Sequence, residues 1–258
     1  MGLHAVLADV HGNRPALEAV LRDLDGRGIA SVFCLGDLVG YCADPNECVQ
    51  IARERGFRAI LGNHELIALG QLGFERCAPG PRKALLRTRE TLDLASRRYL
   101  SGLPRSLTHD GRWVFVHGAV DDVTEYMANE ERVRKNGLAL EQRHPGAHGC
   151  FFGHTHVPAV YQLVGGEVAR HRPEGRVALG GACVWFVNAG SVDGSRSPER
   201  GPARHARFAI LDDTARTLEF HAVRYDHAAV ERRAVRAGYR PGRVARVRRW
   251  LRLLGERT

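Results

Sequence analysis

The sequence predicts a protein of the α/β class. Apolar runs alternate with helical patterns through the first quarter of the chain, which is typical of this class. Short β-rich runs separated by glycine-containing turns dominate the second half. The composition agrees with a folded globular protein, since 44% of the 258 residues are hydrophobic and 26% are charged.

The first quarter predicts the order strand, helix, strand, helix, strand. The opening apolar run ends directly at Asp9 and has the length of a buried strand. Apolar positions at helical spacing follow, with Pro15 in the first turn and Gly26 at the exit. The five predicted elements are a strand at 3–8, a helix at 15–27, a strand at 31–37, a helix at 45–56 and a strand at 57–65 that runs into a loop.

The rest of the chain predicts a helical region followed by strands. The pattern from 66 to 107 is helical with a break at 79–81, and a second helical stretch covers 121–143. The end of the chain predicts two basic amphipathic helices separated at 241–242. Short strands are expected at 113–119, 149–154, 159–164, 183–190, 206–211 and 217–223.

The composition also narrows the class of protein. The sequence has no run of about 18 apolar residues, which a membrane span would need. The first residues lack the basic region of a signal peptide, so we expect a cytoplasmic protein. The six cysteines form no C-x-x-C pair and are expected to be free thiols. The net charge is +9, and ten arginines lie between 232 and 257. They predict a solvated helical tail, with a surface for nucleic acid as the alternative.

Polar residues follow the predicted strands at their C-terminal ends. Each group contains Asp, His or Asn, and most include a glycine. Ligands bind outside the carboxyl ends of strands in open α/β sheets, and glycine lets the backbone approach a bound ion or phosphate closely. These groups lie at 9–13, 36–37, 62–65, 117–118, 153–156 and 188–191. We therefore expect them to form one site.

The residue types and their spacing predict a metal centre. Asp9 and His11 are two positions apart on a segment expected to be extended, as are His154 and His156, so each pair points to one side. Imidazole nitrogen mixed with hard oxygen suits Mn, Fe, Zn or Ni better than Ca or Mg. Seven ligands are too many for one tetrahedral ion and suit two ions that share a carboxylate. The predicted ligands are Asp9, His11, Asp37, Asn63, His117, His154 and His156.

The motifs D-x-H, G-D, G-N-H-E, H-G and G-H-T-H occur in this order between Val6 and Ser191. Together they resemble the calcineurin-like metallophosphoesterases, and R-Y-D-x-x-A-x-E-R-R resembles the tail of the small bacterial and archaeal phosphodiesterase branch. The resemblance implies a four-layer α-β-β-α sandwich of two mixed sheets with flanking helices. It implies a metallophosphoesterase domain over 1–225 and a basic C-terminal helical segment at 226–258, packed on that domain or extending from it.

The resemblance also implies a role for each ligand. The implied ligands are Asp9, His11 and His156 for the first metal, and Asn63, His117 and His154 for the second. Asp37 would bridge both metals, and His64 would be the acid that contacts the phosphate and protonates or stabilises the leaving oxygen. Two divalent ions, Mn²⁺ first and Fe, Zn or Ni as alternatives, would ionise a shared water to a hydroxide that attacks phosphorus.

One departure from the family pattern bears on the substrate. Some branches of the family carry G-D-x-V-D-R-G, but this sequence reads GDLVGY at 36–41 and lacks the arginine that clamps phosphate. The departure favours hydrolysis of small phosphodiesters, cyclic or other nucleotides included. The alternatives are a phosphomonoesterase, protein phosphatase or dinucleoside tetraphosphatase of the same superfamily, or a nucleic-acid-binding factor with a vestigial metal site.

Several residues near the motifs are candidates for substrate contacts. Asn13 is expected to hydrogen-bond a phosphate oxygen or form a turn, and Tyr41 to stack on a base or cover the core edge. Glu65 is expected to orient His64 or to begin a helix. A small phosphoester is the expected partner, and no membrane contact is expected. The candidates for a phosphate clamp are Arg14, Arg82, Arg196 and Arg200.

Overall fold

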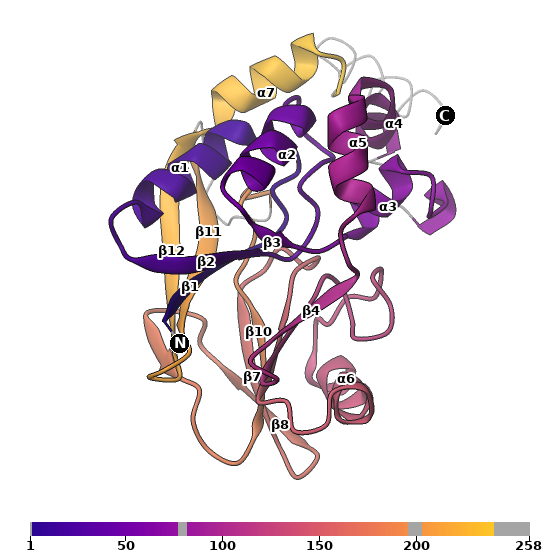
Figure 1. Ribbon diagram of the computed structural model, residues 1–258. Coiled ribbons are helices and arrows are strands. Elements are labelled where there is room, and N and C mark those ends of the chain that lie inside the picture. Colours follow the sequence, from indigo (N-terminus) through magenta and orange to yellow (C-terminus); the bar gives the residue numbers. More distant parts are fainter. Residues whose placement is uncertain (1, 77–81, 196–202, 240–258) are drawn as a thin grey trace, which may run out of the picture.

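The computed structural model describes residues 2–76, 82–195 and 203–239. In this part of the chain two mixed six-stranded sheets pack face to face, and helices cover both outer faces (Figure 1). The predicted four-layer α-β-β-α sandwich is therefore confirmed. The described residues contain no helix that is long and apolar enough to cross a membrane, and their cysteines form no disulfide.

The first sheet has the strand order β3-β2-β1-β11-β12-β9. Strands β1, β2 and β3 run parallel, whereas β11 pairs antiparallel with β1 and with β12. The carboxyl ends of β1, β2 and β3 therefore meet at one edge of this sheet. The strands of the first sheet are β1 Leu3–Leu7, β2 Ile29–Cys34, β3 Arg58–Ala59, β9 Arg176–Ala178, β11 Ala203–Asp212 and β12 Thr217–Asp226.

The second sheet has the strand order β4-β5-β6-β10-β7-β8. Strands β5, β6 and β10 are parallel, and the outer strands are antiparallel to their neighbours. The carboxyl ends of the three parallel strands again share one edge. The strands of the second sheet are β4 Ser106–His109, β5 Trp113–Val116, β6 Gly149–Phe152, β7 Ala159–Val164, β8 Glu167–His171 and β10 Val184–Asn188.

The helices are divided unequally between the two outer faces. Helix α6, Glu130–Arg143, packs on β7 and β8 of the second sheet, and the other helices gather on the side of the first sheet (Figure 1). These are α1 Arg14–Leu24, α2 Pro45–Glu54, α3 Asn63–Ala68, α4 Arg82–Thr91, α5 Leu94–Ser101 and α7 His227–Arg236, with a short 3-10 helix at Phe74–Arg76.

Side-chain alternation along the strands builds the cores between the layers. Leu7 on β1 faces α1 and α2, whereas its neighbour Val6 faces the second sheet. The core between the sheets contains Phe33 and Phe115, whose rings stack with centroids 4.1 Å apart. Phe152 points to the opposite side of the second sheet and joins the core beneath α6. The central strands are therefore buried on both faces.

Three parts of the fold differ from the sequence prediction. The edge strands β4, β8 and β9 were not predicted, because their side chains are largely polar and half exposed. Residues 121–129 form turns and irregular chain, and α6 begins only at Glu130. The predicted strand at 57–65 ends at Ala59, and Asn63 begins α3.

The basic C-terminal segment lies mostly outside the described residues, which end at 239. Its first part forms α7, whose Val230 and Ala234 side chains are buried. The Arg233 guanidinium lies 2.5 Å from the Asp44 carboxylate, so this arginine is engaged within the molecule. The boundary at 225 between a metallophosphoesterase domain and a basic segment stays a prediction, as does a nucleic-acid-binding surface on that segment.

Candidate metal centre

The seven predicted ligands lie together at the carboxyl ends of the parallel strands. They follow β1, β2, β5 and β6 or begin α3, and they come from both sheets. None of their side chains belongs to a residue that is more than 8% exposed. Seven buried polar groups in one place need partners, because an isolated buried polar or charged group is costly.

The first group consists of Asp9, His11 and His156, whose ligand atoms all lie within 4.8 Å of one another. The Nε2 atoms of His11 and His156 are 3.1 Å apart. The Asp9 Oδ1 atom lies 3.5 Å from Nε2 of His156 and 4.0 Å from Nε2 of His11. The three residues predicted to hold the first metal are thus adjacent in space.

The second group consists of Asp37, His117 and His154, with Asn63 beside them. Nε2 of His117 lies 2.9 Å from Asn63 Oδ1 and 3.3 Å from Asp37 Oδ2. The same Oδ2 atom is 3.7 Å from His11 Nε2, so Asp37 reaches both groups. The structure therefore groups the residues as the sequence predicts, while their roles as ligands stay a proposal.

The hydrogen bonds of the imidazole rings fix which nitrogens carry lone pairs. Nδ1 of His11 faces the Val39 carbonyl at 3.3 Å, and Nδ1 of His117 faces the Leu35 carbonyl at 2.7 Å. A carbonyl only accepts, so these Nδ1 atoms carry the hydrogen and the Nε2 atoms of the neutral rings are unprotonated. Nδ1 of His156 faces the Asp193 carboxylate at 3.3 Å and is protonated for the same reason.

Lone pairs consequently face one another across the site. The unprotonated Nε2 atoms of His11 and His156 are 3.1 Å apart, and that of His117 faces the amide oxygen of Asn63 at 2.9 Å. Such contacts are repulsive unless a cation or a proton lies between them. Imidazole nitrogen with carboxylate and amide oxygen is a donor set for divalent transition metals, so the residues present fit this group.

The pKa values show the same excess of negative potential. Burial opposes protonation of His117, but the Asp37 carboxylate outweighs it and raises the pKa of His117 to about 9. Burial likewise opposes protonation of His156, and the Asp9 and Asp193 carboxylates raise its pKa to about 9. Burial raises the pKa of Asp9 to about 6 against the pull of these imidazoles. The cluster thus attracts positive charge, and at neutral pH the Nε2 atoms of His117 and His156 would hold either a proton or a cation.

The backbone at the ligands is left-handed, which corrects the prediction of extended segments. Strand β1 ends at Leu7 and β6 at Phe152, before the ligands begin. This conformation is uncommon outside glycine and costs about 1–3 kcal/mol per residue. Backbone hydrogen bonds hold the turns, such as that from His11 N–H to the Asp37 carbonyl at 2.7 Å. The ligands with positive φ are Asp9, His11, Asp37, His154 and His156, at 55–62°.

Sequence reasoning missed Asp193, which lies behind His156. Its fully buried carboxylate is 3.3 Å from Nδ1 of His156, and Ser195 Oγ is 2.6 Å from the same atom. The Asp193 backbone N–H donates to the carbonyl of Asp9, so the residue is fixed against the first group. The available signal was its position two residues beyond Ser191, just after the last of the polar groups at the strand ends.

His64 lies beside Asp37 at the start of α3. Its Nε2 is 3.9 Å from Asp37 Oδ2, and its buried Nδ1 has no hydrogen-bond partner among the residues that the structure describes. Gly40 makes room for the ring, since a Cβ there would lie 2.2 Å from His64 Nδ1 and 2.9 Å from His11 Nδ1. An unused ring nitrogen at the edge of the site fits the predicted contact with substrate.

Glu65 does not orient His64 but holds the loop that carries Asp37. One carboxylate oxygen accepts from the backbone N–H groups of Asp37 at 2.7 Å and Gly62 at 2.8 Å, and the other accepts from Val39 N–H at 3.0 Å. These bonds also satisfy backbone N–H groups at the start of α3. Of the two expectations for Glu65, a charge at a helix start therefore describes the structure better than a residue that orients His64. The carboxylate is fully buried.

The residues predicted to contact substrate have internal partners. Asn13 caps α1, where its Oδ1 accepts from Ala16 N–H at 3.2 Å, which is the expected turn role. The Tyr41 ring packs on His11 with centroids 4.1 Å apart. Arg14 pairs with Glu18 at 2.7 Å and Arg82 lies over the Phe74 ring. Arg196 and Arg200 lie outside the described residues, and all substrate contacts stay predictions.

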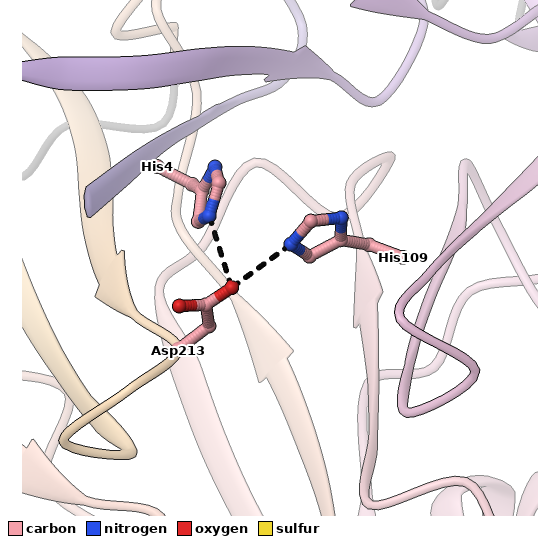
Figure 2. A group of neighbouring side chains, drawn as sticks. All are labelled: His4, His109 and Asp213. Carbon is pink, nitrogen blue, oxygen red and sulfur yellow. Dashed lines mark hydrogen bonds and ion pairs between the residues drawn. The ribbon is translucent and has the colours of Figure 1, made fainter. Parts of the chain in front are cut away.

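A second cluster of similar composition differs in its hydrogen bonding. Figure 2 shows His4, His109 and Asp213, and both imidazole Nε2 atoms lie 3.0–3.1 Å from Asp213 Oδ2. The Arg58 guanidinium donates to Nδ1 of His109 at 3.1 Å, so Nε2 of that ring carries a hydrogen and donates to the carboxylate. The contacts to Asp213 are therefore favourable without a cation, although the buried Nδ1 of His4 has no hydrogen-bond partner among the described residues. His4 on β1 and His109 on β4 thereby join the two sheets through Asp213.

Comparisons with known proteins agree with the fold and with the motifs. The family model described as calcineurin-like phosphoesterase superfamily domain matches residues 3–215. An uncharacterized protein of Methanocaldococcus jannaschii is 30% identical over 229 residues, which are 86% of this chain and 87% of that protein.

Solved structures are similar over almost the whole chain. The metallophosphoesterase from Sphaerobacter thermophilus is 29% identical with a TM-score of 0.77, and the match covers 92% of this chain and 94% of that one. A hypothetical protein from Pyrococcus horikoshii is 21% identical with a TM-score of 0.69, covering 93% and 95% of the two chains, and shows likeness of fold.

Proposed function

Because the chain belongs to the calcineurin-like phosphoesterase superfamily, we propose that it is a binuclear-metal-dependent phosphoesterase that hydrolyses small phosphodiesters. The superfamily, and the similarity of the chain to the metallophosphoesterase from Sphaerobacter thermophilus, indicate a phosphoesterase hydrolase. The observation that carries the finer proposal is the convergence of buried ligand atoms in two groups, Asp9 with His11 and His156, and Asp37 with His117 and His154, each group within 4.8 Å. A divalent cation in each group would be ligated by these atoms.

Two sets of residues would hold two cations. When bound, the cations would lower the pKa of a water molecule and neutralise charge on the phosphate. Asp37 would be shared, since its Oδ2 lies 3.3 Å from His117 Nε2 and 3.7 Å from His11 Nε2. The proposed ligands are Asp9, His11 and His156 for one cation, and Asn63, His117 and His154 for the other.

The chain's own groups orient the ligands and serve the leaving group. Carbonyl oxygens of Leu35 and Val39 accept from the Nδ1–H groups of His117 and His11, which aims both Nε2 atoms into the site. The His64 ring, whose Nε2 lies 3.9 Å from Asp37 Oδ2, would donate a hydrogen bond to the leaving oxygen. The metal ligands need no protein nucleophile beside them, so no phosphorylated enzyme is expected.

The loop after β2 favours diesters over monoesters. Gly40 and Tyr41 stand where other branches place an arginine clamp, and the Tyr41 ring packs on His11. Arg14 is engaged with Glu18 on α1. A diester carries one negative charge where a monoester carries up to two, so a site with less guanidinium charge suits the diester.

The proposal is tested by turnover with added Mn²⁺. Bis-p-nitrophenyl phosphate, 2′,3′-cyclic nucleotides and p-nitrophenyl phosphate are compared for the wild type and for Asp37→Asn, with the exposed Asp25→Asn as control. We expect metal-dependent turnover that prefers the diesters, survives Asp25→Asn and is lost in Asp37→Asn. Turnover that depends on neither the metal nor Asp37 would contradict the mechanism. Faster turnover of p-nitrophenyl phosphate than of the diesters would indicate that the substrates are phosphomonoesters.

A further inference from the structure

A cavity of about 390 Å³ opens beside the candidate metal centre, on the outer face of the second sheet. Its wall includes Thr155, which lies between His154 and His156 in the chain. Tyr126, another wall residue, stacks on the His154 ring with centroids 4.0 Å apart and an interplanar angle of 22°. The cavity is therefore lined by a residue that stacks on one proposed ligand and by the residue that separates two of them in the chain.

The cavity is lined by aromatic and apolar side chains. Tyr161 and Ala159 on β7 are buried, as is Met127 in the loop before α6. Tyr126 is 45% exposed, so much of its ring is open to a ligand or to solvent. Tyrosine rings and a thioether are the surfaces that bind flat aromatic groups best.

The wall of the cavity also includes one positively charged side chain, that of Arg170. Arg170 on β8 is exposed, and its guanidinium carbon lies 5.8 Å from the centre of the Tyr161 ring. A guanidinium over an aromatic surface adds attraction for a planar π system. The single positive charge also suits an electron-rich ring better than an aliphatic chain.

The volume limits the occupant to a small group. Small-molecule pockets span about 300–1,000 Å³, so about 390 Å³ admits one ring system with its linkage rather than a polymer. A larger cavity of about 550 Å³ lies between α6 and the β7–β8 turn, but neither Thr155 nor Tyr126, the residues next to the proposed ligands, lines it. Position, not size, therefore identifies the smaller cavity as part of the site.

We propose that this cavity binds a planar aromatic group of the phosphoester substrate, a nucleobase or an aryl ring, while the phosphate lies at the metal centre. The proposal rests on the proposed function, because the phosphate must be anchored beside His154 for the attached ring to reach Tyr126 and Tyr161. It predicts that the protein distinguishes aromatic from aliphatic phosphoesters.

Two non-hydrolysable probes test this. Methylphosphonate and phenylphosphonate carry the same charged head, and their P–C bonds resist hydrolysis, so binding is measured by calorimetry on the Mn²⁺-loaded protein without turnover. We expect phenylphosphonate to bind roughly fivefold to tenfold more tightly, the range expected of one aromatic contact.

Variants test whether the preference for phenylphosphonate arises in this cavity. Tyr126→Ala removes the exposed ring and Ala159→Leu fills the cavity, and each should bring the ratio of the two Kd values close to one. Methylphosphonate should bind both variants as it binds the wild type, which also shows that they fold and keep the metals. Leu138→Ala in the larger cavity, where Leu138 is 68% exposed, should leave the ratio unchanged.

The outcomes separate this inference from the proposed function. Equal Kd values in the wild type, or a phenyl preference that survives both Tyr126→Ala and Ala159→Leu, overturn the aromatic subsite while leaving the phosphoesterase proposal intact. Failure of both phosphonates to bind in the presence of Mn²⁺ overturns the inference, because no phosphate head is then held beside the cavity. The proposed function falls with it only if the diester is not turned over either.

Discussion

At the scale of single residues, the site is a set of acceptors aimed at one another. The carbonyls of Leu35 and Val39 fix the tautomers of His117 and His11, and Asp193 does the same for His156. Each ring thereby turns an unprotonated nitrogen into the site. A binding protein for an anion would present donors here, so this pattern separates a cation site from an anion site.

Replacing His64 separates its role from that of the ligands. His64→Ala should keep both cations but lower kcat by about 10²–10⁴-fold, because it removes a proton donor rather than a ligand. Elemental analysis of the purified variant and its turnover of a diester are measured together. A variant that loses its metals would contradict this role and place His64, whose Nε2 lies 3.9 Å from Asp37 Oδ2, among the ligands.

Gly40 offers a second test, because its missing side chain makes room for His64 and His11. A Cβ would lie 2.2 Å from His64 Nδ1, and φ is +141°, so Gly40→Ala should cost at least tenfold in kcat/KM and destabilise the fold. Gly28→Ala is the matched control, since its φ is +69° and nothing lies within 4 Å of the added Cβ. Unchanged turnover in Gly40→Ala, with Gly28→Ala also active, contradicts the placement of His64.

Residue types alone could not predict the local geometry of the ligands. The spacing of Asp9 and His11 suggested an extended strand, yet both residues are left-handed, and hydrogen bonds to the loop after β2 and from the Asp193 backbone hold them so. Asp193 was missed because no local pattern distinguishes it from a turn aspartate. Both features depend on contacts between distant segments, whereas the identity of the candidate ligands was readable from motif order.

At the scale of elements, strands that are buried on both faces could be predicted and polar edge strands could not. β5 is a continuous apolar run, and β1 is apolar apart from His4. β4, β8 and β9 lie at sheet edges, where one face is solvated and the apolar pattern is weak. Pairing with a neighbour, not the local sequence, makes these segments strands.

The link between the sheets at Asp213 should appear in the pH dependence of stability. Burial opposes ionisation of Asp213, but hydrogen bonds from Gly2 N–H and from His109 and His4 lower its pKa to about 2. A lowered carboxyl pKa contributes stability above the unfolded value near 4, and this contribution is lost as the pH falls toward 2.

Asp213→Asn should therefore lose about 2 kcal/mol at pH 7 relative to the wild type. The difference in unfolding free energy should shrink as the pH falls from 5 to 2, as measured by denaturant titration at each pH. Asp25→Asn, at a carboxylate that is 61% exposed, should change stability by less than about 0.5 kcal/mol. A difference that is small at pH 7, or that grows on acidification, contradicts the role of this cluster.

At the scale of the whole molecule, the two sheets bring the site together. Asp9 and Asp37 come from the first sheet, and His117, His154 and His156 from the second. The site therefore exists only when both sheets pack. Cation binding should consequently stabilise the packed state as a unit, since the unfolded chain has no such site.

Metal removal tests this coupling. At a free metal concentration 100-fold above Kd, each site adds about 2.7 kcal/mol, which corresponds to roughly 5–10 °C in Tm for a chain of this size. Chelation should lower Tm accordingly and re-addition of Mn²⁺ should restore it. The same treatment of Asp37→Asn should produce a smaller change, and an equal change in both proteins would place the stabilising metal elsewhere.

The most direct test of the central claim is the number of cations bound per chain. Equilibrium dialysis of the metal-free wild type against Mn²⁺, followed by elemental analysis, should give two ions per chain at saturation, falling to one or none in Asp37→Asn. A saturated wild type that holds no ion or one ion, with Fe and Zn giving the same result, would contradict a shared two-cation site.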